Sequence, residues 1–223
     1  MIRTRTWHRV GYAGHVWVFD LDDTLHDASA YIFPHINRAM TQYLITHLDL
    51  NEDDANRLRR QYWHLYGATL RGLMRHHGTD PHHFLHHTHQ FPQLRSMIVK
   101  ARGLRIALRQ LAGRKIVFTN APLAYAEQVL KLLKVRDLFE GVFSIESTRF
   151  HPKPSTLGFI RLLRHYHMRP EHCTMVEDSL PALLTAKKFG MHTVYIHPKA
   201  KRPTFVDVRI SSVLALPRIA ATL

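Results

Sequence analysis

Short apolar runs alternate with helically spaced apolar positions along most of the chain. Runs rich in β-branched and aromatic residues predict buried strands over 16–19, 115–118, 141–144, 173–176 and 193–196. Between them, helical spacing predicts helices over 101–111, 127–133, 155–166 and 181–188. Because strands that alternate with helices form parallel sheets with right-handed crossovers, the pattern predicts an α/β fold with a doubly wound, Rossmann-like sheet.

One long segment departs from this alternation. Between residue 27 and about residue 92 there is no strand signal, and helical spacing runs over 31–48 and 55–74. This pattern predicts a helical domain inserted after the first strand. We therefore expect an α/β core at 15–26 and 95–223, a helical cap at 27–94 above the carboxyl ends of the strands, and a basic amino-terminal arm at 1–14.

Two carboxylates stand where the first predicted strand ends. Asp20 and Asp22 are separated by one residue, so in an extended backbone they project to the same side. Such carboxylates repel each other unless a cation or a shared proton lies between them. Mg²⁺ prefers oxygen ligands and commonly uses one or two carboxylates together with substrate phosphate. The simpler alternative is a strand end with two solvated acids.

Other polar residues follow the later strands. Thr119 and Asn120 supply a hydroxyl and an amide after the strand at 115–118. Lys153 lies between two prolines, whose fixed backbone angles stiffen the loop. The strand at 173–176 ends in a second acidic pair, Glu177-Asp178. Since the carboxyl ends of parallel strands bind ligands, these groups together predict a magnesium-dependent phosphoryl-transfer site.

The order of these motifs resembles that of the haloacid dehalogenase superfamily of phosphohydrolases, over most of the chain. The motifs are Asp20-Leu21-Asp22-Asp23-Thr24, Thr119, Lys153 and Glu177-Asp178. The resemblance implies that Asp20 is the nucleophile and forms an aspartyl-phosphate. It implies that Asp22 protonates the leaving oxygen and later takes a proton from water. Phosphate and substrate oxygens would be held by Thr119, Lys153, Thr24 and Asn120.

The resemblance also implies a Mg²⁺ site. Asp20 and Asp178 would bind the ion through their carboxylates, Asp22 through its backbone carbonyl, and Glu177 either directly or through water. Family members with aspartate at both positions of the last motif differ from this chain, which has the Glu-Asp pair. The departure concerns the geometry of the metal ligands, because a carboxylate is retained.

Asp22 distinguishes between reactions within the superfamily. Dehalogenating relatives lack an acid at this position because a halide needs no proton to leave, so halide release is not expected. A phosphomutase would keep both aspartates, and the distinction from a phosphatase lies in the cap.

The cap segment Tyr62–Leu73 resembles that of the pyrimidine 5′-nucleotidase branch. The candidates for substrate contact are Tyr66, Thr69 and Arg71, together with Tyr62 and Trp63. Alternatively, the three aromatic residues form the buried face of one helix. We expect a phosphatase of a small metabolite, with a pyrimidine nucleoside 5′-monophosphate as the substrate and phosphoglycolate or a sugar phosphate as the alternative.

Histidines are concentrated at 76–89, in a chain that has 19 of them. His82 and His86, or His83 and His87, are spaced to share one helix face. Two imidazoles alone make a weak metal site without a third ligand and supporting hydrogen bonds. We therefore expect surface residues here rather than a metal site.

The strongly basic charge of the chain indicates an alternative class of function. The 31 Lys and Arg against 17 Asp and Glu give a formal charge of +14 and a pI of about 10.3, values that suit a nucleic-acid-binding protein. The basic residues are spread out, however, and no helix-turn-helix or zinc-finger pattern accompanies them. We expect no dedicated nucleic-acid partner, and the oligomeric state stays open.

The single cysteine, Cys173, lies within a predicted strand and cannot form an intramolecular disulfide. We expect it to be a buried thiol. With no signal peptide and no apolar stretch of roughly 18 residues, the sequence predicts a cytoplasmic protein without a membrane partner.

Overall fold

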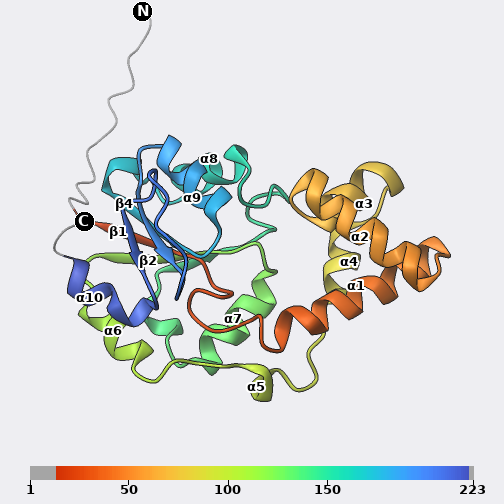
Figure 1. Cartoon of the computed structure of the whole chain (residues 1–223), viewed down its shortest axis with the longest axis horizontal. Coiled ribbons are helices and arrows are strands. Elements are labelled where there is room, and N and C mark those ends of the chain that lie inside the picture. Colours follow the sequence, from red (N-terminus) through yellow and green to blue (C-terminus); the bar gives the residue numbers. More distant parts are fainter. Residues whose placement is uncertain (1–13, 221–223) are drawn as a thin grey trace, which may run out of the picture.

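A six-stranded parallel sheet forms the centre of the computed structural model, which describes residues 14–220 (Figure 1). The strand order is β3-β2-β1-β4-β5-β6. The strands are β1 (Val16–Phe19), β2 (Arg114–Phe118), β3 (Gly141–Phe143), β4 (Cys173–Glu177), β5 (His192–Ile196) and β6 (Val208–Ile210). All five pairings are parallel, which confirms the predicted doubly wound α/β fold.

Both faces of the sheet are covered, which explains why its strands are apolar at consecutive positions. Along β1, Trp17 and Phe19 join a core with helices α6 (Leu104–Gln110), α7 (Leu123–Leu132) and α10 (Leu216–Ile219). Val16 and Val18 point the other way, into a core with α8 (Thr156–His165) and α9 (Leu180–Lys188). The alternation follows from the two-residue repeat of side-chain direction in a strand.

Four helices between β1 and β2 form a helical insert beside the sheet (Figure 1). They are α1 (Ile32–Leu48), α2 (Glu52–Tyr66), α3 (Thr69–His77) and α4 (Pro81–Thr88), followed by the short α5 (Leu94–Met97). The insert has its own apolar core, in which Tyr43, Tyr62, Leu73 and Phe84 are buried. Ile145, from the loop after β3, belongs to the same core and connects the insert to the sheet.

The single helix predicted over 55–74 is wrong. The chain breaks between α2 and α3 at Gly67, whose φ of 77° is left-handed. Glycine adopts this conformation without steric cost, and its N–H caps α2 by donating to the Trp63 carbonyl. The α2 and α3 helices then pack closely, because Gly72 leaves room for the Tyr62 ring.

Smaller departures also have local causes. The helix predicted from residue 101 begins at Leu104, after Gly103 with a φ of 91°. The helix predicted from residue 127 begins earlier, at Leu123, directly after Pro122. Strand β6 was not predicted, and its three residues are too few to give a pattern.

Predictions for the cysteine, the amino-terminal arm and membrane-spanning helices can also be compared with the structure. Cys173 is buried as predicted, and burial raises the pKa of its thiol to about 12. The predicted basic arm lies outside the described residues except for Gly14. Between residues 14 and 220, no helix has the length and apolar character needed to cross a membrane.

Candidate active site

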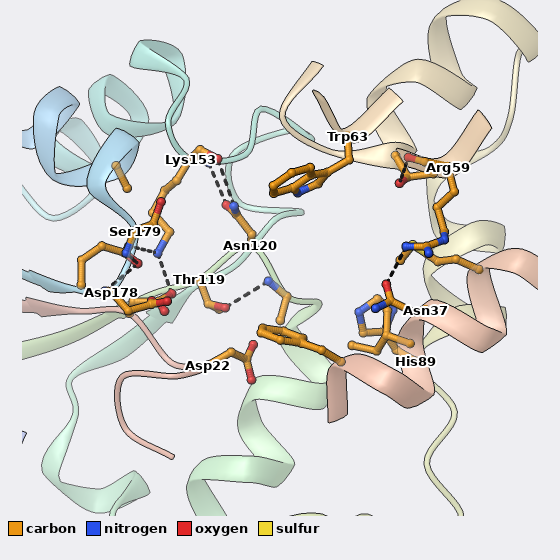
Figure 2. A pocket seen from close by; sticks show the side chains of 18 residues that line it. Asp22, Asn37, Arg59, Trp63, His89, Thr119, Asn120, Lys153, Asp178 and Ser179 are labelled. Atoms are coloured by element: carbon orange, nitrogen blue, oxygen red, sulfur yellow. Dashed lines mark hydrogen bonds and ion pairs between the residues drawn. The ribbon is translucent and has the colours of Figure 1, made fainter. Parts of the chain in front are cut away.

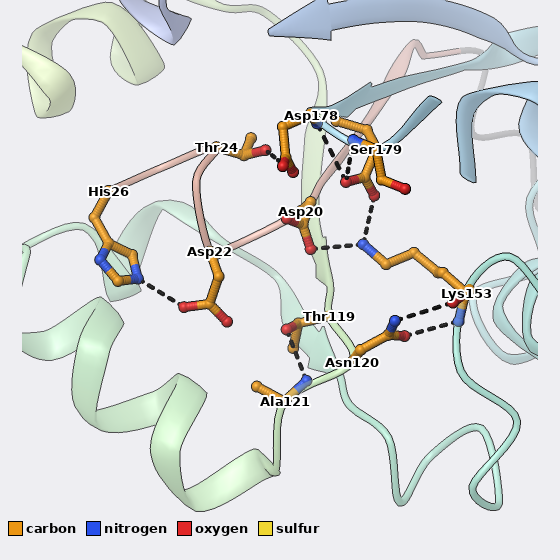
Figure 3. Close-up of polar contacts among 11 residues, drawn as sticks. Asp20, Asp22, Thr24, His26, Thr119, Asn120, Ala121, Lys153, Asp178 and Ser179 are labelled. Atoms are coloured by element: carbon orange, nitrogen blue, oxygen red, sulfur yellow. Dashed lines mark hydrogen bonds and ion pairs between the residues drawn. The ribbon is translucent and has the colours of Figure 1, made fainter. Parts of the chain in front are cut away.

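The carboxyl ends of three neighbouring strands bring the predicted polar residues together (Figure 3). Asp20 follows the central strand β1, Thr119 follows β2, and Glu177 ends β4. Because β1 pairs with both β2 and β4 in parallel, these ends meet at one edge of the sheet. The Asp20 backbone N–H donates to the Val176 carbonyl at 2.9 Å, which continues the β1–β4 pairing into the site.

A buried cluster of charges occupies this edge. The Lys153 ammonium donates to Asp20 Oδ1 and to Glu177 Oε2, both at 2.6 Å. All three side chains are buried. The other Glu177 oxygen, Oε1, accepts from the backbone N–H groups of Asp178 at 3.2 Å and Ser179 at 3.1 Å. Glu177 thus holds Lys153 with one oxygen and the turn after β4 with the other.

Negative charge in the cluster is incompletely balanced. Burial and the Glu177 charge together raise the pKa of Asp20 to about 7, although Lys153 opposes the shift. Burial likewise raises the pKa of Glu177 to about 7, again against the effect of Lys153. For Asp178, burial and the Asp20 charge raise the pKa to about 6. The carboxylates keep the pKa of Lys153 above its usual range although burial alone would lower it.

This donor set fits a hard divalent cation. Asp20, Glu177 and Asp178 each have a carboxylate oxygen within 4.8 Å of the others. Three carboxylates face one ammonium group, and a divalent cation would neutralise the excess negative charge. Oxygen donors of this kind suit Mg²⁺.

Asp22 is held by two residues that sequence reasoning missed. Its Oδ1 accepts from the Tyr125 hydroxyl at 2.7 Å and is paired with His26 Nε2 at 2.9 Å. Burial and the Asp22 charge raise the pKa of Tyr125 above its usual range, so its hydroxyl stays protonated and donates. Tyr125 lies 103 positions from Asp22, and no local pattern relates the two.

Three other predicted residues have definite partners. Asn120 is bonded to the Lys153 backbone through both ends of its amide, with Oδ1 accepting at 2.7 Å and Nδ2 donating at 3.1 Å. The Thr119 hydroxyl accepts from the Ala121 N–H at 3.0 Å. Thr24 donates to Asp178 Oδ1 at 3.4 Å, so its hydroxyl faces a carboxylate.

A cavity of about 570 Å³ opens between this edge of the sheet and the helical insert (Figure 2). From the sheet side, its wall includes Asp20, Asp22, Thr119, Asn120, Lys153, Glu177 and Asp178. From the insert side, its wall includes Phe33, Ile36, Asn37, Met40, Arg59, Trp63 and Thr69, with His89 next to the insert. The cavity has a polar end at the carboxylates and a largely apolar end at the helices.

The five candidates from the helical segment separate in the structure. Trp63 is 58% exposed and its ring points from α2 into the cavity (Figure 2), whereas Tyr62 is buried in the insert core. Thr69 reaches the wall, with its hydroxyl donating to the Arg59 carbonyl at 3.1 Å. The wall formed by residues 14–220 does not include Tyr66 or Arg71, and the Tyr66 hydroxyl is bonded to His76 Nε2 at 2.6 Å.

Sequence reasoning missed Arg59 and Asn37 at the far end of the cavity. Arg59 donates to Asn37 Oδ1 at 2.8 Å (Figure 2). Its Nε is buried and has no hydrogen-bond partner among the described residues. Such a group costs free energy unless a ligand pairs with it. No signal in the chain marks these residues, because they are polar positions on amphipathic helices.

Comparison with known proteins agrees with the fold and the motifs. Residues 17–196 match the haloacid dehalogenase-like hydrolase family, and the chain belongs to this family. A HAD phosphatase from Thermococcus onnurineus superposes with a TM-score of 0.66 at 19% identity, covering 92% of this chain and 97% of that chain. A 2-haloacid dehalogenase from Pseudomonas syringae pv. Tomato DC3000 gives 0.60 at 20% identity, covering 93% and 98%.

One curated relative is more similar in sequence. Phosphate metabolism protein 8 of Saccharomyces cerevisiae is 26% identical over 135 residues. The aligned part is 57% of this chain and 42% of the yeast protein, so the chain spans less than half the length of this relative.

His89, in the cavity wall, predicts a pH dependence of stability. Burial lowers its pKa from 6.5 to about 4, against the smaller opposite effect of Asp22. The unfolded chain therefore binds this proton more readily than the folded chain, and stability is lost as the pH falls from 6.5 towards 4. Between about pH 7 and pH 5, the wild type should lose up to about 2 kcal/mol more than His89→Gln.

Urea unfolding at both pH values measures this difference. The control is His64→Gln, an exposed position on α2, which should keep the wild-type pH dependence. Equal pH dependence in His89→Gln and the wild type would contradict the assignment.

Proposed function

We propose that the protein is a Mg²⁺-dependent phosphomonoester hydrolase that acts through an aspartyl-phosphate on Asp20. The observation that carries this proposal is the buried contact of the Asp20 carboxylate with Lys153, beside two further carboxylates at the same edge of the sheet. Asp20, Asp178, the Asp22 backbone carbonyl and Glu177 are the residues that would hold Mg²⁺. When bound, the ion neutralises negative charge on the phosphoryl group.

The geometry supports Asp20 as the nucleophile. Lys153 contacts Asp20 Oδ1 at 2.6 Å, which orients the carboxylate and places a positive charge where the phosphoryl oxygens would come. Thr119 and Asn120 line the same end of the cavity. Charge on the transferred group is greatest in the transition state, so donors that are already in place lower the barrier. Asn120 also fixes the Lys153 backbone at both its N–H and its carbonyl.

The position of Asp22 supports its proposed role in proton transfer. Asp22 lies two residues after Asp20 and lines the cavity, beyond the end of β1. A carboxyl group in this position can protonate the leaving oxygen in the first step and take a proton from water in the second. Tyr125 and His26 hold it by hydrogen bonds and so fix the direction of the carboxyl group. Because halide release needs no such acid, the residue favours a phosphatase over a dehalogenase, two activities that the fold alone does not separate.

The helical insert would then be a cap that selects the leaving group. We propose residues 27–94 as this cap and a pyrimidine nucleoside 5′-monophosphate as the substrate. The exposed Trp63 ring offers a face on which a base can stack. Arg59 Nε and the Asn37 amide lie beyond it as partners for polar atoms of the base. Tyr66 and Arg71 remain candidates that would need the cap to move.

We also propose that the partner is a small phosphorylated metabolite and that the compartment is reducing. A phosphorylated metabolite, with no dedicated nucleic-acid partner, fits a cavity between the sheet and the helical insert better than it fits an open basic surface. The single buried thiol of Cys173 is compatible with a reducing compartment such as the cytoplasm.

Asp20→Asn tests the nucleophile. The amide keeps the shape of the side chain but cannot attack phosphorus, so turnover should fall by at least about a thousandfold. Phosphate release is measured with Mg²⁺ on UMP, CMP, dTMP, AMP, phosphoglycolate and sugar phosphates. The control Asp53→Asn, exposed in the first turn of α2, should be as active as the wild type.

Retained turnover in a folded Asp20→Asn protein would overturn the nucleophile assignment. Activity confined to phosphoglycolate or sugar phosphates would reject the nucleotide substrate and leave the phosphatase proposal intact.

Tyr125→Phe tests the hydrogen bond that orients the Asp22 carboxylate. The ring stays in the core and only the hydroxyl that donates to Asp22 is lost, so kcat should fall about tenfold while KM changes little. Steady-state kinetics measure both constants. Tyr166→Phe is the matched control, since the Tyr166 hydroxyl lies beside Gly141 and away from the cavity. An unchanged kcat in Tyr125→Phe would show that this hydrogen bond does not serve the reaction.

Trp63→Ala tests base stacking. Stacking of a base on an aromatic ring is worth about 1–3 kcal/mol, so KM for UMP should rise by about fivefold to a hundredfold. Acetyl phosphate, which has no base, should be hydrolysed with an unchanged KM. Leu65→Ala removes another exposed apolar side chain of α2 and should have no effect. The stacking proposal fails if KM for UMP is the same in Trp63→Ala as in the wild type.

A further inference from the structure

Three imidazoles converge on the helical insert, apart from the carboxylate site. His47 comes from the last turn of α1, and His83 and His87 come from α4, which packs against α1 (Figure 1). Each has a ring nitrogen within 4.8 Å of a ring nitrogen of the other two, and all three side chains are exposed. The third ligand that the histidine-rich segment lacks in the sequence is therefore supplied by another helix.

Packing between the two helices explains the convergence. His83 and His87 are four residues apart and share one face of α4. Helix α4 begins at a defined point, because the Asp80 carboxylate accepts from the His83 N–H at 2.6 Å. Below the imidazoles, the Tyr43 and Phe84 rings meet edge to face at 5.0 Å in the insert core. The scaffold beneath the cluster is thus buried and fixed.

Hydrogen bonds orient two of the three rings. His87 Nδ1 lies 2.8 Å from the His83 backbone carbonyl, and because a carbonyl only accepts, Nδ1 carries the proton. The lone pair of His87 is then on Nε2. His83 Nδ1 lies 2.9 Å from the Tyr43 hydroxyl, and in the tautomer in which Nδ1 donates to that oxygen, the His83 lone pair is on Nε2 too. Metal-binding histidines are commonly held in this way, with the second nitrogen donating to an oxygen.

The other two histidines of α4 are not part of the three-histidine cluster, although the His86 ring meets the His87 ring edge to face at 5.4 Å. His82 packs against the Phe150 ring at 5.2 Å, and His86 is bonded through Nδ1 to the Gln90 amide at 3.2 Å.

We propose that His47, His83 and His87 form a second metal site, for a divalent transition ion such as Zn²⁺. Imidazole nitrogens suit Zn²⁺, Cu²⁺ and Ni²⁺, whereas the all-oxygen carboxylate site suits Mg²⁺. Three protein ligands leave a position of a tetrahedral ion for water. The bound ion links the end of α1 to α4 and so ties together two helices of the insert. This site does not depend on the phosphatase proposal.

Calorimetric titration with Zn²⁺ tests the site on the full chain without an affinity tag, after removal of metals with EDTA and in the presence of excess Mg²⁺. The wild type should bind one Zn²⁺ at this site, and Asp178→Asn should retain it. Alanine at His47, His83 or His87 should weaken binding by at least about tenfold, since loss of a supporting group alone can cost that much. His82→Ala is the matched control on α4, since the His82 ring packs against Phe150, and it should bind as the wild type does.

Thermal unfolding supplies a second readout. An ion that binds only the folded chain raises the Tm, so Zn²⁺ should raise the Tm of the wild type and of His82→Ala but not of His47→Ala. Circular dichroism without metal checks that the variants fold. Undetectable Zn²⁺ binding in the wild type would overturn the proposal, and so would equal binding by His47→Ala or equal weakening by His82→Ala.

Discussion

The Lys153 ammonium lies between the Asp20 and Glu177 carboxylates, and the rest of the site depends on this buried contact. Burying one carboxylate costs free energy unless an opposite charge accompanies it. Here two share one lysine and a third lies within 4.8 Å, so the cluster stays under-neutralised. Burial, together with the neighbouring negative charges, raises the pKa values of its acids. This excess of negative charge suits a divalent cation. The cation and a negatively charged phosphoryl group can bind together, because their charges offset each other.

The fold supplies what this contact requires. Parallel pairing of β1 with β2 and β4 places their carboxyl ends side by side, and helices on both faces exclude water from beneath them. Asn120 ties the Lys153 loop to the end of β2 through both sides of its amide. The helical insert forms the opposite wall of the cavity, where we propose that side chains meet the part of the substrate that is not phosphate.

The sequence predicted the parts of the protein whose signal is local. Apolar runs locate the strands, and the polar residues after them locate Asp20, Thr119 and Glu177, because a strand's end is where its side chains reach ligands. The contacts of Tyr125 with Asp22, of Arg59 with Asn37 and of His47 with α4 join distant segments, so no spacing reveals them. The break at Gly67 is different: a glycine after a helical run is a recognised stop signal, but the apolar spacing continues beyond it and predicts one helix across it.

A crystal structure of the protein grown with Mg²⁺ and beryllium fluoride, which mimics an aspartyl-phosphate, would test the central claim most directly. We expect the fluoride adduct on the Asp20 carboxylate, a Mg²⁺ ion in contact with Asp20 and Asp178 at about 2.1 Å, and Lys153 turned to a fluorine atom. An adduct on another residue, or Mg²⁺ bound away from these carboxylates, would contradict the proposed chemistry.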